Sequence, residues 1–511
     1  MTLNPERLRG EAKALKKAFA NGEASAKART QAVLPDIAEL KHAQALHVVA
    51  REAGFESWPK LKFAVEMSGM DRAERLQRLK MAIYHGQTWV IERLLDEDPT
   101  LPEGQFWAQV SLFDRAAVEQ ALQADPTLAT RPEGLRSPIL HLAFSRWLKA
   151  RPELEGEMLG IAEMLLAHGA DVNDGYPYEE GDTHLLSALY GALGHADNMP
   201  LARWLLEHGA NPNDNESLYH ATELGHHDGL DMLIAHGADP TGTNALLRAM
   251  DFNDHVAVEK LLAAGADPND GIADHPSGQP PEVVSALHQA ARRGNDARMI
   301  EILVAAGADI EACYQGITPY AMARSFGSLD AAKALADAGA DTTLPEEIAL
   351  VAAAADGPVP AGQFIDPAKL PDELRNLLRA VIVDPSKFEF AKRLVSIGIE
   401  WDRPDNMSMT PVQIAGWEGL PDQMEYLLGQ KPDLGHINGY GGTLLSTVIH
   451  GSENCPARSS RDHIACARLA LEEGVALPRP AIRFAGDPDM AAFLADWAEA
   501  HPGQVVEHGI G

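Results

Sequence analysis

Apolar residues in the central part of the chain recur at spacings of three and four, and each such run stops at a glycine. The segments ARWLLEHG, which begins at Ala202, and AVEKLLAAG, which begins at Ala257, show this pattern. The spacing places the apolar side chains on one face of a helix. Because glycine adopts the left-handed conformation without strain, each run is predicted to be an amphipathic helix that ends at its glycine.

That glycine belongs to a phrase that returns along the chain. It reads LLAHGADVND from Leu165, LLEHGANPND from Leu205, LIAHGADPTG from Leu233, LLAAGADPND from Leu261 and LVAAGADIEA from Leu303. A shorter helix is predicted between phrases, because a capping Ser or Thr precedes a proline suited to the first helical turn. These pairs are Ser137-Pro138, Thr318-Pro319 and Thr410-Pro411. We therefore expect a stack of two-helix units and not one globular core.

The units resemble the ankyrin repeat family through several ordered motifs. SALHQAARRGN from Ser285, SLYHATELGHHDGLDMLIAHGADP from Ser217 and ITPYAMARSFGS from Ile317 carry the resemblance. It implies an all-α, ankyrin-type helical repeat solenoid, as in bacterial ankyrin repeat domain-containing proteins. Short helices would line a concave inner face, longer helices would form the back, and hairpin-like loops, here named fingers, would project from the inner edge. In this family, fingers and inner helices usually contact a macromolecular partner.

The same markers divide the chain into six segments. Residues 71–134 are predicted to be divergent repeats, because Asp98 and Asp125 stand where the glycine is expected. The best-formed repeats span residues 135–345. The other segments are an N-terminal charged helix plus helical hairpin at 1–70, a distorted helical segment at 346–386, divergent ankyrin repeats at 387–480 and a C-terminal cap at 481–511.

The N-terminal hairpin has recognisable helix signals. A charged helix is expected within residues 1–30, and a second helix from about Asp36 with a stop at Gly54. Ser57 would cap a further helix that is entered near Pro59. Phe55 and Trp58 are expected to pack across the hairpin.

This hairpin also suggests an alternative function. The spacing from Ala50 to Gly54 occurs in helix-turn-helix DNA readers, and residues 1–80 carry 15 basic and 10 acidic residues. However, Glu52, Glu56 and Glu66 lie in or near the would-be recognition region. We favour a structural hairpin and keep a nucleic-acid-linked regulator, using this helix-turn-helix-like segment, as the alternative.

The fingers differ in length, and this directs the search for a binding site. The fingers after Gly209 and Gly237 are short and predict a notch, whereas long loops lie at 174–183 and 270–284. Aromatic and acidic side chains on a long loop suit the capture of a basic segment, and apolar residues before the inter-helix glycines suit anchoring. The predicted partner-binding residues are Tyr176, Tyr178, Glu179, Glu180, Asp182, Leu224, Phe252, Phe326 and Trp417.

Catalytic and metal chemistry are not favoured. The set His220, Glu223 and His227 is interrupted by Gly225, and the histidines before the marker glycines lie one repeat apart, too far to share an ion. The resemblance implies that His141, His220 and His288 are structural hydrogen-bonding residues. Phosphate-loop, nucleophile-elbow and HExxH motifs are missing from the sequence. We therefore predict no catalytic residue, no metal, no cofactor and no enzyme, unless a deep cleft with convergent carboxylates or histidines lies near the notch.

Composition and charge complete the prediction. The formal net charge is −31, 45% of the residues are hydrophobic, and there are three cysteines. A strongly acidic body repels nucleic acid and anionic membranes and suits a basic partner. The sequence has neither a secretion signal nor an apolar run of the roughly 20 residues that a membrane helix needs. We predict a cytoplasmic, non-catalytic protein–protein interaction scaffold whose partner is a protein with a basic segment, with nucleic acid contacted only through residues 1–80.

Overall fold

The computed structural model describes residues 5–178, 181, 184–270 and 284–507. The chain forms two compact units, one of residues 70–343 and one of residues 1–69 together with 344–511. Helices dominate both units, and the short strands occur only as two pairs among the described residues. No helix in these ranges has the length and apolar character needed to cross a membrane.

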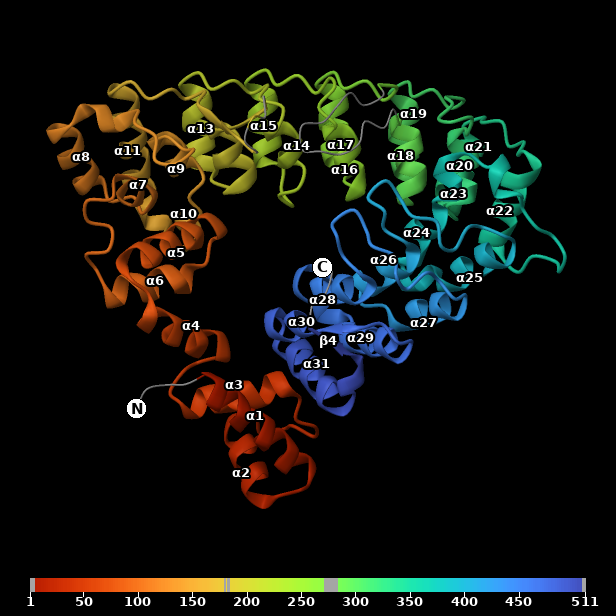
Figure 1. The fold of residues 1–511 in the computed structure, drawn as a ribbon. Coiled ribbons are helices and arrows are strands. Elements are labelled where there is room, and N and C mark those ends of the chain that lie inside the picture. The colour runs from red at the N-terminus through yellow and green to blue at the C-terminus, as the bar shows by residue number, and fades with distance from the viewer. Residues whose placement is uncertain (1–4, 179–180, 182–183, 271–283, 508–511) are drawn as a thin grey trace. The chain divides into compact units, whose positions relative to one another are not determined.

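In the unit of residues 70–343, short inner helices alternate with longer outer helices, and the helices from α13 to α21 stand side by side (Figure 1). The predicted two-helix repeat is confirmed. The elements are α5 (Arg72–His85), α6 (Thr88–Glu97), α7 (Phe106–Ser111), α8 (Arg115–Ala124), η1 (Pro126–Ala129), α9 (Pro138–Ala143), α10 (Trp147–Ala150), η2 (Pro152–Leu154), α11 (Glu155–Ala167), β1 (Gly175–Pro177), β2 (Leu185–Ser187), α12 (Ala188–Tyr190), the π-helix η3 (Gly191–His195), α13 (Met199–Glu207), α14 (Ser217–Ala221), α15 (Asp228–Ala235), α16 (Ala245–Asp251), α17 (His255–Ala263), α18 (Ala286–Arg293), α19 (Ala297–Ala305), α20 (Pro319–Ser325) and α21 (Leu329–Asp337).

The recurring phrase ends the outer helices as its sequence predicts. Its glycines have φ values between 86° and 105°, the left-handed region that side chains with a Cβ rarely adopt. The asparagine that follows joins neighbouring loops. The Asn269 amide donates to the Gly307 carbonyl at 3.0 Å, and the Asn269 side-chain oxygen accepts from the Asp309 amide at 2.6 Å. The phrase therefore sets both the helix end and the link to the next repeat.

In two early repeats an aspartate stands in place of that glycine, and the helix ends in a different way. After α6 the chain leaves the helix at Asp98 with φ −138°, and after α8 it leaves at Asp125 with φ −145°. Each aspartate accepts hydrogen bonds from the backbone and hydroxyl of the threonine two residues later. An extended exit followed by an Asx turn therefore needs no left-handed residue.

The other unit contains the N-terminal and C-terminal helices. Its elements are α1 (Pro5–Ala20), α2 (Ala24–Val33), α3 (His42–Glu52), α4 (Trp58–Gly69), α22 (Glu346–Asp356), η4 (Pro367–Lys369), α23 (Asp372–Arg375), α24 (Leu377–Ile382), η5 (Pro385–Lys387), α25 (Phe388–Ser396), α26 (Pro411–Trp417), α27 (Pro421–Gly429), α28 (Leu444–Asn454), η6 (Arg458–Ser460), α29 (His463–Glu472), β3 (Leu477–Pro478), α30 (Arg479–Phe484), α31 (Pro488–Ala500), η7 (Pro502–Gln504) and β4 (Val505–Val506). Within this unit α3 packs on α31, and Lys13 pairs with Asp496 at 3.2 Å.

The N-terminal segment departs from its prediction. A turn at Gly22 separates α1 from α2 where one helix is predicted, and the apolar face of α1 is buried on α3. The helix expected from Asp36 begins only at His42. The stop at Gly54 and the packing of Phe55 and Trp58 in one core are confirmed.

Candidate partner-binding surface

A row of polar side chains crosses the inner helices at the predicted notch. It starts beside β2, passes along α14 and α16 and ends on α18. Each member is hydrogen-bonded or ion-paired with the next. We name this row the polar ladder, and its members are His184, Glu216, His220, Glu223, Arg248, Asp251 and Arg293.

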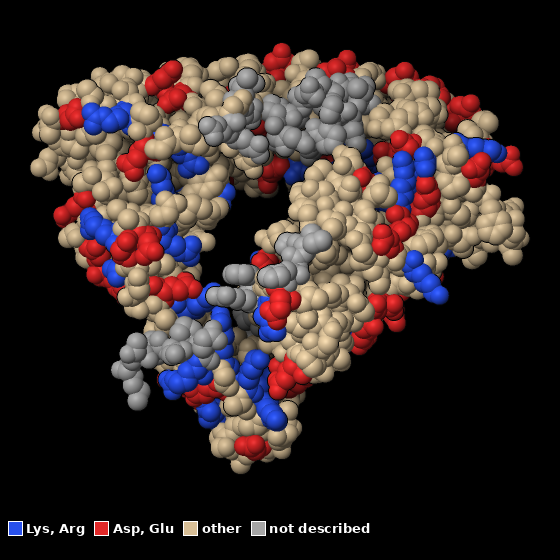
Figure 2. All heavy atoms as spheres, viewed as in Figure 1, with Lys and Arg blue, Asp and Glu red and all other residues tan. Residues whose placement is uncertain are grey.

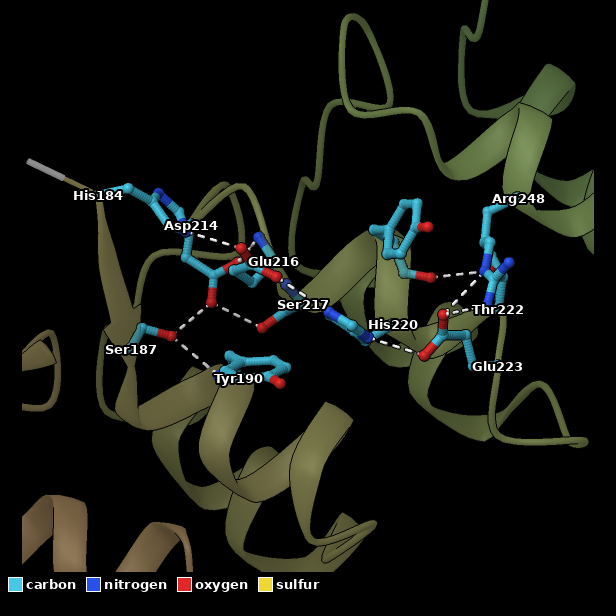
Figure 3. Close-up of polar contacts among 11 residues, drawn as sticks. His184, Ser187, Tyr190, Asp214, Glu216, Ser217, His220, Thr222, Glu223 and Arg248 are labelled. Atoms are coloured by element: carbon cyan, nitrogen blue, oxygen red, sulfur yellow. Dashed lines mark hydrogen bonds and ion pairs between the residues drawn. The ribbon is translucent and has the colours of Figure 1, made fainter. Parts of the chain in front are cut away.

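Glu216 is the centre of the first half of the polar ladder (Figure 3). Only 2% of its surface is exposed. One of its carboxylate oxygens lies 2.7 Å from His184 Nε2, and the other lies 2.9 Å from His220 Nε2. Burial alone would raise the pKa of Glu216, but its hydrogen bonds and charge interactions with His220 and His184 outweigh burial and lower the pKa. A buried carboxylate is therefore kept ionised by two imidazoles.

His220 is held between two carboxylates. Its Nδ1 lies 2.8 Å from Glu223, opposite the bond to Glu216. Burial would lower the pKa of His220, yet the hydrogen bonds and charges of both glutamates raise it to about 9. The imidazole is therefore cationic at neutral pH. This differs from its predicted counterparts, because His141 and His288 bond to backbone carbonyls and burial lowers the pKa of both.

The second half of the polar ladder couples three repeats. The Arg248 guanidinium on α16 lies 2.7 Å from Glu223 and 2.8 Å from Asp251. Asp251 in turn pairs with Arg293 of α18 at 2.7 Å and accepts from Gln289 at 2.7 Å. In this half of the ladder two carboxylates alternate with two guanidinium groups, so it links the inner helices without a net excess of either sign.

The polar ladder holds an exposed aromatic side chain in place. Phe252, directly after α16, is 52% exposed. The Arg248 guanidinium carbon lies 4.9 Å from the centre of the Phe252 ring and 5.5 Å from that of Tyr219. Because two carboxylates fix Arg248, the stacked Phe252 is a pre-positioned apolar contact on the inner side of the repeats.

The two tyrosines predicted to contact a partner differ in their exposure to solvent. Tyr178 is 72% exposed, whereas Tyr176 is buried in β1, opposite Leu186 of β2. The Tyr176 ring contacts Phe144 at 5.2 Å and its hydroxyl accepts from Arg136 at 2.6 Å. The prediction that Tyr176 offers contact area to a partner is therefore not met in this structure, since alternation along the strand turns it inward.

The remaining predicted contacts are distributed over several places. Glu179, Glu180 and Asp182 lie outside the described residues. Phe326 is buried where α20 ends, so it packs inside its repeat and offers no surface. Leu224 is partly buried beside the polar ladder. Trp417 is partly buried at the end of α26, in the other unit.

The cavity that the described residues form beside the predicted notch is small. The polar ladder does bring carboxylates and histidines together, but the cavity beside the second short finger, near Pro240 and Gly242, has a volume of only about 30 Å³. That volume is about what one water molecule occupies. Among the described residues, no group of three or more His, Cys, Asp or Glu side chains is arranged to hold a metal ion.

The N-terminal hairpin uses several of its cations internally. The three glutamates that argue against DNA reading each pair with a basic side chain of the same segment. These pairs are Arg29 with Glu52, Lys60 with Glu56 and Lys62 with Glu66. Figure 2 shows basic side chains gathered in the lower part of the view, with acidic side chains among them. The basic excess of this segment is therefore partly neutralised.

Sequence reasoning missed the polar ladder as a unit. Its members lie about 25 to 42 residues apart where they join neighbouring repeats, as in Arg248 with Glu223 and Arg293 with Asp251. The available signal was the recurrence of charged residues in the last turns of successive inner helices. That signal becomes informative only when the repeats are aligned and stacked.

Comparison with known proteins agrees with the repeat architecture. A family model for ankyrin repeats matches three times, at residues 155–244, 195–272 and 246–346. A crystal structure of an ankyrin repeat domain from Acinetobacter baumannii is similar at 25% identity over 38% of this chain and 97% of that domain, with a TM-score of 0.30. No curated protein matches the chain. Residues 155–346 therefore consist of ankyrin repeats.

Proposed function

We propose that this chain is a non-catalytic protein–protein interaction scaffold of the cytoplasm. Ankyrin repeats are in general protein–protein interaction modules. The proposed contact surface is the inner side of α14, α16 and α18, with Phe252 as the apolar contact and the polar ladder as its support.

The observation that carries this proposal is that the exposed Phe252 ring stacks on Arg248, a side chain that is itself held in place. An aromatic ring that is half exposed gains little from folding, but it contributes strongly when a partner buries it. Arg248 is already held by Glu223 and Asp251. The side chains of this surface therefore lose little additional entropy when a partner binds.

The chemistry of the partner follows from charge. The net charge of −31 favours a protein with a basic segment, because complementary charge speeds encounter and disfavours wrong partners. Acidic finger residues, including Glu179, Glu180 and Asp182, are proposed to attract that segment, and the exposed Tyr178 lies directly before them.

A matched pair of substitutions tests the surface. Phe252 and Leu329 are both 52% exposed, but Leu329 begins the outer helix α21. Partners captured from native extract by the wild-type chain would be identified by mass spectrometry and produced for affinity measurement. Phe252→Ala should weaken binding at least about tenfold, in the range of aromatic hot spots, while Leu329→Ala leaves it unchanged. Equal binding by the wild-type and Phe252→Ala chains would refute this surface.

A further inference from the structure

A second candidate binding site lies in the unit formed by residues 1–69 and 344–511. It is a groove of about 750 Å³ between two finger turns and the inner helices α26 and α28. The exposed atoms of its walls are mostly apolar, and the larger side chains are Met407, Met409, Trp417, Tyr440 and His450. Grooves of this size and character accommodate organic ligands or anchoring side chains.

The two finger turns that border the groove are fixed to each other. The Gly439 amide donates to the Met407 carbonyl at 2.7 Å, and His436 Nε2 lies 2.6 Å from the Ser408 carbonyl. The groove is therefore formed before any ligand arrives. A preformed groove saves the ordering entropy that a flexible loop would lose on binding.

The inner helices hold Trp417 at one side of the groove. A Cβ atom on Gly451 would lie 2.2 Å from the Trp417 carbonyl oxygen, so α26 and α28 approach closely only because residue 451 is glycine. His463 Nε2 lies 2.9 Å from the same oxygen. These contacts fix the backbone of Trp417 and leave its indole ring to line the groove.

The groove presents apolar surface and unused hydrogen-bonding groups. Tyr440 is 74% exposed at a finger tip. Within the described part of the chain, neither the Trp417 indole nitrogen nor the Tyr440 hydroxyl makes a hydrogen bond. An aromatic ring with a free polar end is typical of residues that become buried on binding. The groove therefore suits a ligand with both an apolar part and hydrogen-bond acceptors, as a peptide segment has.

Charge selects among possible peptides. Asp405 is the only Asp, Glu, Lys or Arg residue among those that line the groove. The surrounding residues 400–455 include eight acidic residues against two basic ones, and Arg403, one of the two, is already paired with Asp372 at 3.0 Å. A second copy of this chain would bring a net charge of −31. The electrostatics therefore favour a basic partner over self-association.

We propose that this groove binds a basic segment of a partner protein. An aliphatic or methionine side chain of that segment enters between Trp417 and Tyr440, and an adjacent Lys or Arg lies close to Asp405. The inference deepens the proposed protein-binding function, but it concerns a site in a different unit from Phe252, so either site can fail alone.

Peptide selection tests this site without a known partner. A displayed library of random dodecapeptides would be selected on the chain of 511 residues, and enriched peptides would be synthesised with a fluorescent label. Binding would be measured by anisotropy on the wild type, on Tyr440→Lys and on Phe364→Lys. Phe364 is a matched control, because it is an aromatic residue 72% exposed in the same unit and outside the groove.

The expected result is a set of peptides with an aliphatic or methionine residue next to Lys or Arg. Such a peptide should bind Tyr440→Lys at least about tenfold more weakly than wild type, bind Phe364→Lys equally, and weaken as salt is raised. Enrichment of acidic or uncharged peptides, failure to enrich any, or equal binding to Tyr440→Lys would overturn the inference. A peptide whose binding depends on Phe252 and not on Tyr440 would also overturn it, while supporting the proposed function.

Discussion

Replacing Glu216 with Gln would test the polar ladder most sharply. This change removes the buried carboxylate that joins His184 and His220 and keeps the side-chain volume. His220 would retain only Glu223 as a carboxylate partner. Its pKa should therefore fall from about 9 toward the ordinary value of 6.5.

The size of the stability effect follows from the pKa of His220. A rise from 6.5 to about 9, at about 1.4 kcal/mol per unit, corresponds to roughly 3 kcal/mol of folding free energy. Because the folded state binds the proton more tightly, this contribution is complete below pH 6.5 and is lost as pH rises through about 9. Glu216→Gln should remove more than half of it, because one of two carboxylate partners is lost while the burial that opposes the charged form remains.

Two measurements check this prediction. Deuterium exchange at imidazole C2–H, read by mass spectrometry, gives the pKa of His220, and urea unfolding at pH 6 and pH 9.5 gives the free energy. Glu163→Gln is the control, because Glu163 is an exposed carboxylate 3.6 Å from His208 and such pairs contribute little. A wild-type His220 that titrates at or below 6.5, or an unchanged pKa in Glu216→Gln, would refute the reasoning.

Three further predictions concern stability. Gly451→Ala should lower the free energy of unfolding, measured with urea, by about 1–3 kcal/mol, because the new methyl group clashes with the Trp417 carbonyl. Gly429→Ala is the control and should leave this free energy unchanged, because the space around residue 429 is open. Burial lowers the pKa of His141 to about 3, so as pH falls the unfolded chain takes up this proton before the folded chain does. The free energy of unfolding should therefore fall by roughly 1.4 kcal/mol per pH unit below 6.5. If His141→Gln showed the same dependence of unfolding free energy on acid pH as the wild type, this prediction would be contradicted. Asn269→Ala should cost about 1 kcal/mol and speed amide exchange at residues 307–312, and unchanged exchange there would contradict the loop link.

Local sequence signals predicted the repeat itself. The spacing of apolar residues and the left-handed requirement at each marker glycine depend on a few neighbouring residues, so they can be read directly from the chain. The same signals failed in residues 1–30, where charges alternate with alanines. There the turn at Gly22 and the buried face of Leu8, Leu15 and Phe19 depend on packing against α3.

The candidate surfaces were less predictable because they depend on contacts between distant residues. Tyr176 looks like an exposed finger residue in sequence, but pairing of β1 with β2 turns it toward Phe144. In the sequence, Glu216 is one acidic residue among many, and His220 is expected to be a structural histidine of the repeat. Their shared role appears only when the repeats are stacked and His184 reaches the same carboxylate.

Amide hydrogen exchange on the full-length chain, with and without a captured protein partner, tests the central claim most directly. The claim is that this chain binds a protein through the inner helices α14, α16 and α18. It predicts partner-dependent protection of α14, α16 and the residues around Phe252, with the outer helices α15 and α17 unchanged. Protection confined to the outer helices, or none within residues 70–343, would contradict it.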